Sequence, residues 1–592
     1  MTQTTQNKID DELKLKKRQT FIFWLVIILL LLFFLTSIYF ICFYSPPLII
    51  SPQTTRITGP LTSDGQIDFF RYVEETYFSN PQIATDDNGF RIFTRMFGNV
   101  GECASMSQYF KEQKYKKLGL DINIPPTMTM PESPIKIISD YYAGLGKAIP
   151  NDFGIKMISK LWTLEEAPML AEWIETIDEP LDAIAEMIRK PIFVCPIVQE
   201  ESPSNEYQPL IALLLPDGQN FRGITFSFWA RANYRIAKGD IDGAINDTIT
   251  IYQLGRQLGK DANFFISLLI AISIEDIANK IPLDANPNHP LTKEQLQRLL
   301  DAIDQLPPRV DFLTACEFER ISLLDTTQMF VSGGRVFLSR CGLSGIQYHT
   351  FDYLILFRYF NQNVAFRRVN EAYDIQIGKK TGNISDYYMP SSTSALFKNL
   401  FTSGGRGIIA ANVSVSFYMT DTDIIDVAFK RIDCSFNMKR LTLALMMYKS
   451  EHGDYPKSDW IEKIKPYLGD NFEKSLHCPA CPNQEKGKTN YALILYDKLP
   501  ENKNALLLVE LRDPVPFDQA VIAIDKEMSE SELSEFISKI GSFHNRGITT
   551  ARQSGAIRFI FDSDYKDSSK MQKLIDQNPD DNAEESKNNF DY

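Results

Sequence analysis

The chain of 592 residues lacks the short motifs that mark the common enzyme classes. It has no Walker phosphate loop, no dinucleotide fingerprint, no His-Glu-x-x-His motif and no Gly-x-Ser-x-Gly nucleophile elbow. Positive charge is also scarce, because 62 Lys and Arg residues face 75 Asp and Glu residues, for a net charge of −13. A phosphate backbone would be repelled by this balance, so we expect no nucleic-acid partner. The sequence assigns no catalytic residue and no cofactor.

Cysteine is sparse, with eight residues, and one of them, Cys42, lies in a long hydrophobic segment. The other seven are an odd number, so in an oxidising compartment at least one should stay reduced or pair with another chain. Cys478 and Cys481 form a Cys-x-x-Cys pair in a Pro-containing loop. A structural zinc site usually needs a second such pair, and a thioredoxin-type pair begins a helix. We therefore expect a local disulfide or two reduced thiols here, in preference to a metal or redox site.

Against these absences stands one long hydrophobic run, residues 21–44, which contains no charged residue. As a helix it would be about 36 Å long, enough to cross a hydrocarbon core of about 30 Å. Lys14, Lys16, Lys17 and Arg18 precede it, which predicts that the N-terminus stays in the cytoplasm. The run is longer than the apolar region of a signal peptide, and no small-x-small cleavage site follows. We expect an uncleaved, single-pass anchor in the cytoplasmic (inner) membrane, with the lipid bilayer as its partner.

The other residues, about 550, are too many for one hydrophobic core. Hydrophobic periodicity predicts an α+β protein that is predominantly α-helical. The basic flank of the hydrophobic run predicts that most of the chain is extracytoplasmic. The expected parts are a cytoplasmic tail (1–20), the membrane helix (21–44), an extended stalk (45–60), a mostly helical domain (61–400), a helix with a small antiparallel sheet (421–561) and an acidic disordered tail (562–592).

Two segments have recognisable local patterns. Residues 228–260 resemble one helical hairpin of the tetratricopeptide type, with small residues at Ala232 and Ala244 and a turn at Gly239. No second copy follows at a fixed period, so no superhelical array is expected. Near the C-terminus, residues 548–553 and 556–561 predict a β-hairpin that turns at Ser554 and Gly555.

The C-terminal part resembles a known family. RLTLALMMYKSEHGDYP (440–456) and IKPYLG (464–469) resemble the soluble part of bacterial type II secretion pseudopilins, in which a helix leads into a small antiparallel sheet. FHNRGITTARQSGAIRFI (543–560) resembles the H-X9-DG module of pseudopilin-like proteins, with His544 and Gly555 at the right separation but Ser554 in place of Asp. Several other segments resemble uncharacterised membrane-anchored bacterial proteins. The membrane helix lacks the preceding Gly and internal Glu of a prepilin, so assembly into a pilus is not expected.

Two histidines attract a functional interpretation. His544 could act as a general base, but no nucleophile or orienting acid is identifiable from the sequence, so a structural hydrogen bond at the hairpin entry is favoured. His452 is expected to close the long helix, where an imidazolium complements the helix dipole.

These observations predict a membrane-anchored extracytoplasmic interaction or scaffold protein with protein partners in the envelope and no catalytic activity. One alternative is an accessory component of a type II secretion or pilus-like system. The other is an envelope hydrolase or redox enzyme that uses His544 or the Cys-x-x-Cys pair. A buried cluster of His, Cys and carboxylate groups converging on one pocket would contradict the non-catalytic interpretation.

Overall fold

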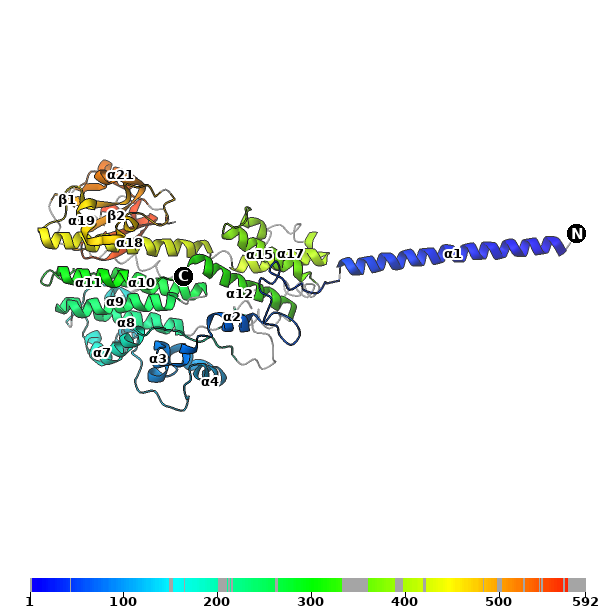
Figure 1. The fold of residues 1–592 in the computed structure, drawn as a ribbon, viewed down its shortest axis with the longest axis horizontal. Helices are drawn as coiled ribbons and strands as arrows, with labels where there is room; N and C mark the ends of the chain where they lie inside the picture. Colours follow the sequence, from blue (N-terminus) through cyan, green and yellow to red (C-terminus); the bar gives the residue numbers. More distant parts are fainter. Residues whose placement is uncertain are drawn as a thin grey trace. The chain divides into compact units, whose positions relative to one another are not determined.

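The computed structural model is mostly helical and contains one five-stranded sheet (Figure 1). It describes residues 3–42, 44–148, 153–163, 165–200, 210, 213, 217–260, 264–332, 360–388, 398–418, 422–482, 484–497, 503–524, 528–541, 544, 547–567 and 570–572.

The chain forms two compact units, and each is assembled from three stretches of sequence. The first comprises Met1–Val73, Ser202–Ala212 and Cys316–Thr420. The second comprises Glu74–Glu201, Leu213–Ala315 and Asp421–Tyr592. Two of the boundaries fall inside helices, α2 (Phe69–Tyr77) and α12 (Phe312–Ser332).

The first unit begins with the long helix α1 (Gln3–Cys42). Within the described residues, this is the one helix long and apolar enough to cross a membrane, between Lys16 and Phe40, and none of that stretch is buried against protein. The helix ends close to the predicted end of the hydrophobic run. It also includes residues 3–20, so the expected cytoplasmic tail is helical.

The rest of the first unit packs around α15 (Gln362–Gln376) and α17 (Ser403–Tyr418), with the short helix η6 (Ile384–Tyr387) against both. The segment that follows α1 lies along α15, where the side chain of Asn370 donates to the Thr54 carbonyl at 2.6 Å. Thr54 and Thr55 are fully buried. The segment expected to be an extended stalk is therefore part of the folded unit.

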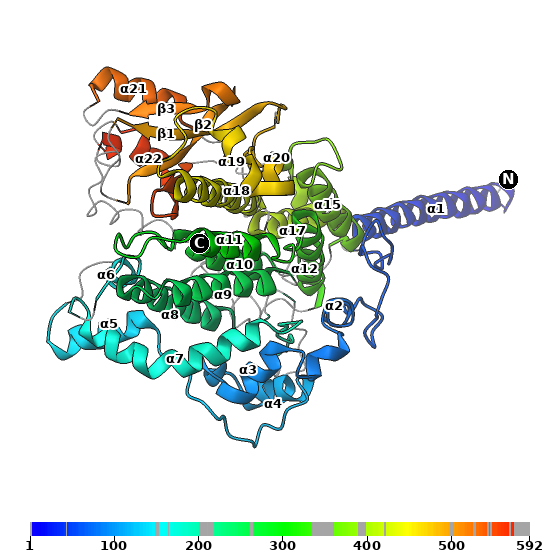
Figure 2. The ribbon, with the colours of Figure 1, turned by 60° about the vertical axis from the view of Figure 1, so that its left-hand side comes forward.

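The second unit contains a helical layer in which α8 (Asp217–Lys238), α9 (Ile241–Lys260) and α10 (Phe265–Lys280) lie side by side (Figure 2). The α8–α9 hairpin turns at Gly239, as the sequence predicted, with φ of +83°. Ala232 and Ala244 are fully buried in this hairpin. The described helices of the second unit that precede its C-terminal part also include η1 (Pro81–Ala84), α3 (Gly89–Phe97), η2 (Gly101–Ser105), α4 (Gln108–Lys117), α5 (Pro134–Gly144), α6 (Phe153–Ile158), α7 (Pro168–Ile188) and α11 (Lys293–Asp304).

The C-terminal part of the second unit is a sheet with helices on both faces (Figure 2). The strands are β1 (Lys488–Tyr496), β2 (Leu506–Pro516), β3 (Val521–Ile524), β4 (Gly547–Arg552) and β5 (Ile557–Phe561), in the order β3-β1-β2-β4-β5. The long helix α18 (Thr422–His452) shares one hydrophobic core with the sheet, α19 (Trp460–Leu468) and α20 (Phe472–Ser475). A second core lies beneath α21 (Glu530–Lys539) and α22 (Asp562–Tyr565), and the short helices η8 (Gly469–Asn471) and η9 (Phe517–Gln519) complete this part.

Two features of this part differ from the sequence prediction. The sheet is mixed and not wholly antiparallel, because β3 pairs with β1 in parallel. The predicted disordered tail begins with folded chain, since Tyr565 and Met571 are buried in the core beneath α21. The remainder of that predicted tail, residues 573–592, lies outside the described residues.

Candidate metal centre

Four side chains from separate segments of the second unit meet between α18 and the sheet. They are Cys434 on α18, Cys478 in the loop after α20, Glu510 on β2 and His544 three residues before β4. Their donor atoms, two sulfurs, one carboxylate oxygen and one imidazole nitrogen, all lie within 4.8 Å of one another. The exposed fraction is 3% for His544 and 0% for the other three. We call these four residues the donor cluster.

The imidazole of His544 contacts two other members of the donor cluster. Its Nε2 atom lies 3.2 Å from Cys478 Sγ and 3.5 Å from Glu510 Oε1. The loop that carries Cys478 is itself anchored, because the Cys478 N–H donates to Asn490 Oδ1 at 3.1 Å. The donor atoms are therefore held by a fixed backbone as well as by packing.

Neighbouring groups orient the other two donors. Tyr491 Oη lies 3.3 Å from Cys434 Sγ. The backbone N–H of Thr549 donates to Glu510 Oε2 at 3.1 Å. These contacts orient Cys434 and Glu510, in the way that hydrogen bonds from neighbouring groups orient the ligands in metal sites.

Glu510 reaches the donor cluster because of its place in the strand ladder. It lies directly opposite Tyr491 in the antiparallel pair of β1 and β2, so the two side chains project from the same face of the sheet. That face packs against α18. Burial of a carboxylate in such a core is costly unless an opposite charge or hydrogen bonds compensate for it.

The protein environment disfavours charge on the donors. Burial raises the pKa of the Cys434 thiol, and a hydrogen bond with Cys434, followed by burial, raises that of Cys478. Burial lowers the pKa of His544 to about 4, and the positive charges of Arg431 and Lys430 act in the same direction. With no ion bound, the donor cluster therefore holds two thiols and a neutral imidazole at pH 7.

The structure brings together two of the residues that the sequence singled out, Cys478 and His544. Cys481 is also buried, but its sulfur is not among the four donors, and its N–H donates to the Cys478 carbonyl at 2.9 Å. Cys478 and Cys481 are not joined by a disulfide. The Cys-x-x-Cys pair thus contributes one donor to the cluster.

The other two motif residues lie outside the donor cluster. Gly555 occupies the β4–β5 turn with φ of +81°, and its carbonyl accepts a hydrogen bond from Lys439 at 2.6 Å. His452 ends α18, where its Nδ1 lies 2.9 Å from the Tyr448 carbonyl and its ring stacks on the Tyr448 ring. Both positions are structural.

Sequence reasoning missed Cys434 and Glu510. Cys434 lies in a long amphipathic helix and carries no local signature. Glu510 did give a signal, since it is the one acid in the apolar run LLLVEL of β2. An acid at a buried strand position calls for a partner, and in the structure that partner set includes His544 and two thiols.

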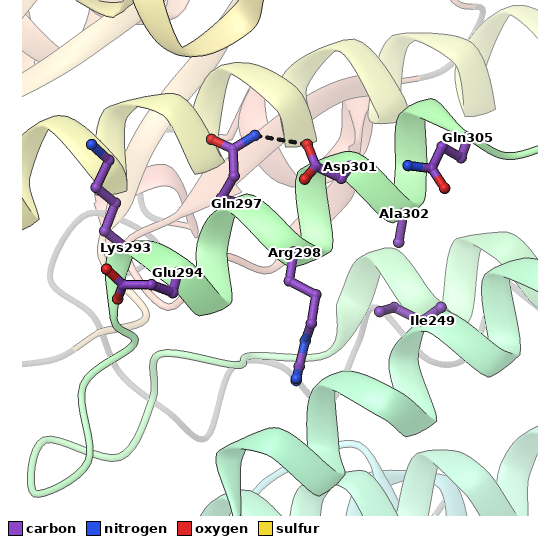
Figure 3. A pocket seen from close by; sticks show the side chains of 8 residues that line it. All are labelled: Ile249, Lys293, Glu294, Gln297, Arg298, Asp301, Ala302 and Gln305. Carbon is purple, nitrogen blue, oxygen red and sulfur yellow. Dashed lines mark hydrogen bonds between the residues drawn. The ribbon is translucent and has the colours of Figure 1, made fainter.

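Two surface hollows of the second unit lie apart from the donor cluster. One hollow, of about 600 Å³, lies between α9 and α11 (Figure 3), and the charged side chains at its rim take part in pairs such as Arg298–Asp242 at 2.8 Å. The other, of about 760 Å³, lies near α7, α8 and α9. Within the described residues, neither is lined by any of the four donors. The structure thus brings together the buried His, Cys and carboxylate groups that the sequence analysis named, and these two hollows are lined by other residues.

A second buried polar group lies among the helices of the second unit. Lys114 Nζ is 2.9 and 3.0 Å from the two Asp217 oxygens and 3.2 Å from Cys103 Sγ, and Cys195 Sγ is 3.3 Å from Asp217 Oδ2. The ammonium group already neutralises the carboxylate. Burial raises the pKa of Cys103 to about 12. This group is therefore an ion pair with two protonated thiols.

Comparison with known proteins adds no family to this geometry. No family model matches the chain, and no curated protein and no solved structure was found to be similar to it.

Proposed function

We propose that this chain is a single-pass, membrane-anchored interaction or scaffold protein. In this proposal the N-terminus is cytoplasmic, most of the chain lies outside the cytoplasmic membrane, and its partners are other envelope proteins. The observation that carries the proposal is the surface of α1, which is apolar and exposed over most of its length from Phe21 to Phe40.

The reason for this inference is the free-energy cost of exposing apolar side chains to water. Leaving one Leu or Phe side chain in water instead of burying it costs roughly 1.5–3 kcal/mol. Helix α1 exposes an uninterrupted row of such residues, with Phe33 at 73% and Phe21 at 68%. A bilayer covers such a helix on all sides and leaves its backbone hydrogen bonds intact. The Lys16, Lys17 and Arg18 flank supports the cytoplasmic placement of the N-terminus.

The closed donor cluster supports a non-catalytic role. Catalytic metal and acid–base sites keep an open position for substrate or water, commonly in a concave pocket. All four members of the donor cluster are buried, and neither described hollow reaches them. An arrangement of this kind favours stabilisation of the fold over chemistry on a substrate.

A second candidate function is that of an accessory component of a type II secretion or pilus-like system. The observation that favours it is the packing of α18 against a small sheet, with the motif residue Gly555 at the β4–β5 turn. Recovery of secretion or pilus proteins with the tagged, detergent-solubilised chain would support this candidate. Recovery of other envelope proteins alone would favour the general scaffold role.

Membrane placement can be tested by fractionation and protease accessibility. The full chain with a C-terminal tag should stay in the membrane fraction after an alkaline wash and be released by detergent. Protease added to spheroplasts should remove the tag. A variant without residues 1–42 is the matched control and should be released without detergent. Full-length chain in the soluble fraction, or a tag protected in intact spheroplasts, would contradict the proposal.

A further inference from the structure

We propose that the donor cluster binds one Zn²⁺ ion through Cys434 Sγ, Cys478 Sγ, one Glu510 carboxylate oxygen and His544 Nε2. The ion joins α18 to the sheet and stabilises the C-terminal part of the second unit. This inference goes beyond the membrane role and does not depend on it.

The chemistry of the donors selects the metal class. Two thiolates, one imidazole and one carboxylate are all established zinc ligand types, and four protein ligands are the usual number in a structural zinc site. Calcium and magnesium take oxygen ligands, so a set with two sulfurs does not suit them. Copper(I) and iron–sulfur clusters favour sulfur more strongly than this mixed set provides.

The geometry needs little adjustment to bind the ion. Zinc–sulfur and zinc–nitrogen bonds of about 2.3 and 2.0 Å place the ligand atoms of a tetrahedral site about 3.3–3.8 Å apart. His544 Nε2 already lies 3.2 Å from Cys478 Sγ and 3.5 Å from Glu510 Oε1, and no donor pair exceeds 4.8 Å. Small side-chain rotations therefore suffice, without rearrangement of the strands.

Charge complementarity points the same way. Zinc bound by two thiolates, a carboxylate and a neutral imidazole has a net charge of −1. Lys430 and Arg431 lie four and three residues before Cys434 on α18, so they share its side of the helix. Both act on His544 as positive charges. They offset the net negative charge of the loaded site.

The expected role of the ion is structural, because four buried protein donors leave no position for a substrate. The donors come from segments that span residues 434 to 544, so the bound ion closes long stretches of chain. Binding energy in such a site is folding energy, because the unfolded chain does not hold the donors together. Contacts from Tyr491 and Thr549 support the ligands from outside.

Metal content of the detergent-solubilised full chain is the first test. The wild-type chain should contain close to one zinc per chain, and C478S and E510Q should each lose most of it. C481S is the matched control, because Cys481 lies in the same loop, is also buried and is not a donor. C481S should keep one zinc. Equal loss of zinc in C478S and C481S, or a wild-type chain without zinc after refolding with the ion, would overturn the proposal.

A second measurement keeps the test valid if the ligand variants fail to fold. The wild-type chain, stripped by a chelator and reloaded with Co²⁺, should show tetrahedral cobalt bands and thiolate-to-cobalt charge-transfer absorption. The chelator alone should lower the unfolding temperature, and Zn²⁺ should restore it. A cobalt spectrum without thiolate absorption would overturn the proposal. So would a non-reduced peptide map in which Cys434 and Cys478 are linked as a disulfide.

Discussion

Lys439 is a fully buried lysine on α18 whose Nζ donates to the Gly555 carbonyl at 2.6 Å. Burial, followed by the positive charge of Arg558, lowers its pKa to about 7. Lys439→Met removes this buried charge at the cost of one hydrogen bond, worth about 1 kcal/mol. We expect the variant to be more stable than wild type at pH 6–7, by on the order of a few kcal/mol.

The stability difference between Lys439→Met and wild type should depend on pH. Between pH 7 and the ordinary lysine pKa, the unfolded chain binds more protons at this position than the folded chain, so the stability of wild type rises with pH. The advantage of Lys439→Met should therefore shrink as the pH rises toward 10. Urea unfolding at pH 6.5 and 9.5 measures the difference in free energy of unfolding between the variant and wild type, with Lys457→Met as an exposed control. The same difference between Lys439→Met and wild type at both pH values would contradict the assignment.

At this scale the sequence could identify candidate residues but not their partners. Cys478 and His544 stood out because each belongs to a short motif. Their assembly with Cys434 and Glu510 depends on how α18 lies against the sheet and on the β1–β2 register. No local pattern encodes either of these, so only the misplaced charge of Glu510 in an apolar strand could have warned of the site.

At the scale of the element, the α8–α9 hairpin offers a matched pair of glycines. Gly239 adopts φ of +83°, and an added Cβ would lie 2.6 Å from His289 Nε2. Gly223 lies inside α8 with nothing within 4 Å of an added Cβ. Gly239→Ala should destabilise the protein by about 1–2 kcal/mol, and Gly223→Ala should stabilise it by roughly 0.5–1 kcal/mol.

Shifts in the denaturant midpoint of the same unfolding transition measure both effects. Opposite signs for the two alanines would show that Gly239 is required at this position, by its positive φ and its close contact with His289, whereas Gly223 is not. Equal destabilisation by both variants would contradict this explanation.

Elements that depend on local chemistry were predictable, and those that depend on tertiary pairing were not. The capping box that begins α11 has a Thr292 and Gln295 spacing that can be read from the sequence, and the β4–β5 hairpin turns at Gly555. Strand β3 pairs in parallel with β1 through a connection that no periodicity reveals. The acidic composition after residue 562 led to a prediction of disorder, but Tyr565 packs into a hydrophobic core and the start of that segment is folded.

At the scale of the whole molecule, chain order and spatial grouping diverge. Both units are built from stretches that alternate along the sequence, and residues 202–212 of the first unit fall between two stretches of the second. Composition along a chain shows linkers and periodicity but does not show which distant segments share a core. The helical content and the long apolar helix α1 could therefore be predicted, whereas this division could not.

The segment after α1 joins this helix to the rest of the first unit. The side chain of Asn363 donates to the Pro47 carbonyl at 2.9 Å and accepts from the Ile49 N–H at 2.7 Å. Asn370 donates to the Thr54 carbonyl at 2.6 Å. These hydrogen bonds hold the first part of a segment that continues into a turn, where the Thr54 N–H donates to the Ser51 carbonyl at 3.1 Å. They should therefore contribute to the protection of the segment from solvent.

Replacing both side chains, Asn363→Leu with Asn370→Leu, should release this segment without unfolding α15. We expect amide hydrogen exchange within residues 48–55, above all at Ile49, to become at least tenfold faster in the detergent-solubilised chain, because the Ile49 N–H donates to the Asn363 side chain. Asn383→Ala, which removes the cap of η6 in the same unit, is the matched control and should leave their exchange unchanged. Fast exchange already in wild type would contradict the prediction. Slow exchange in wild type that only the double variant loses would show that Asn363 and Asn370 hold the segment after α1 against α15.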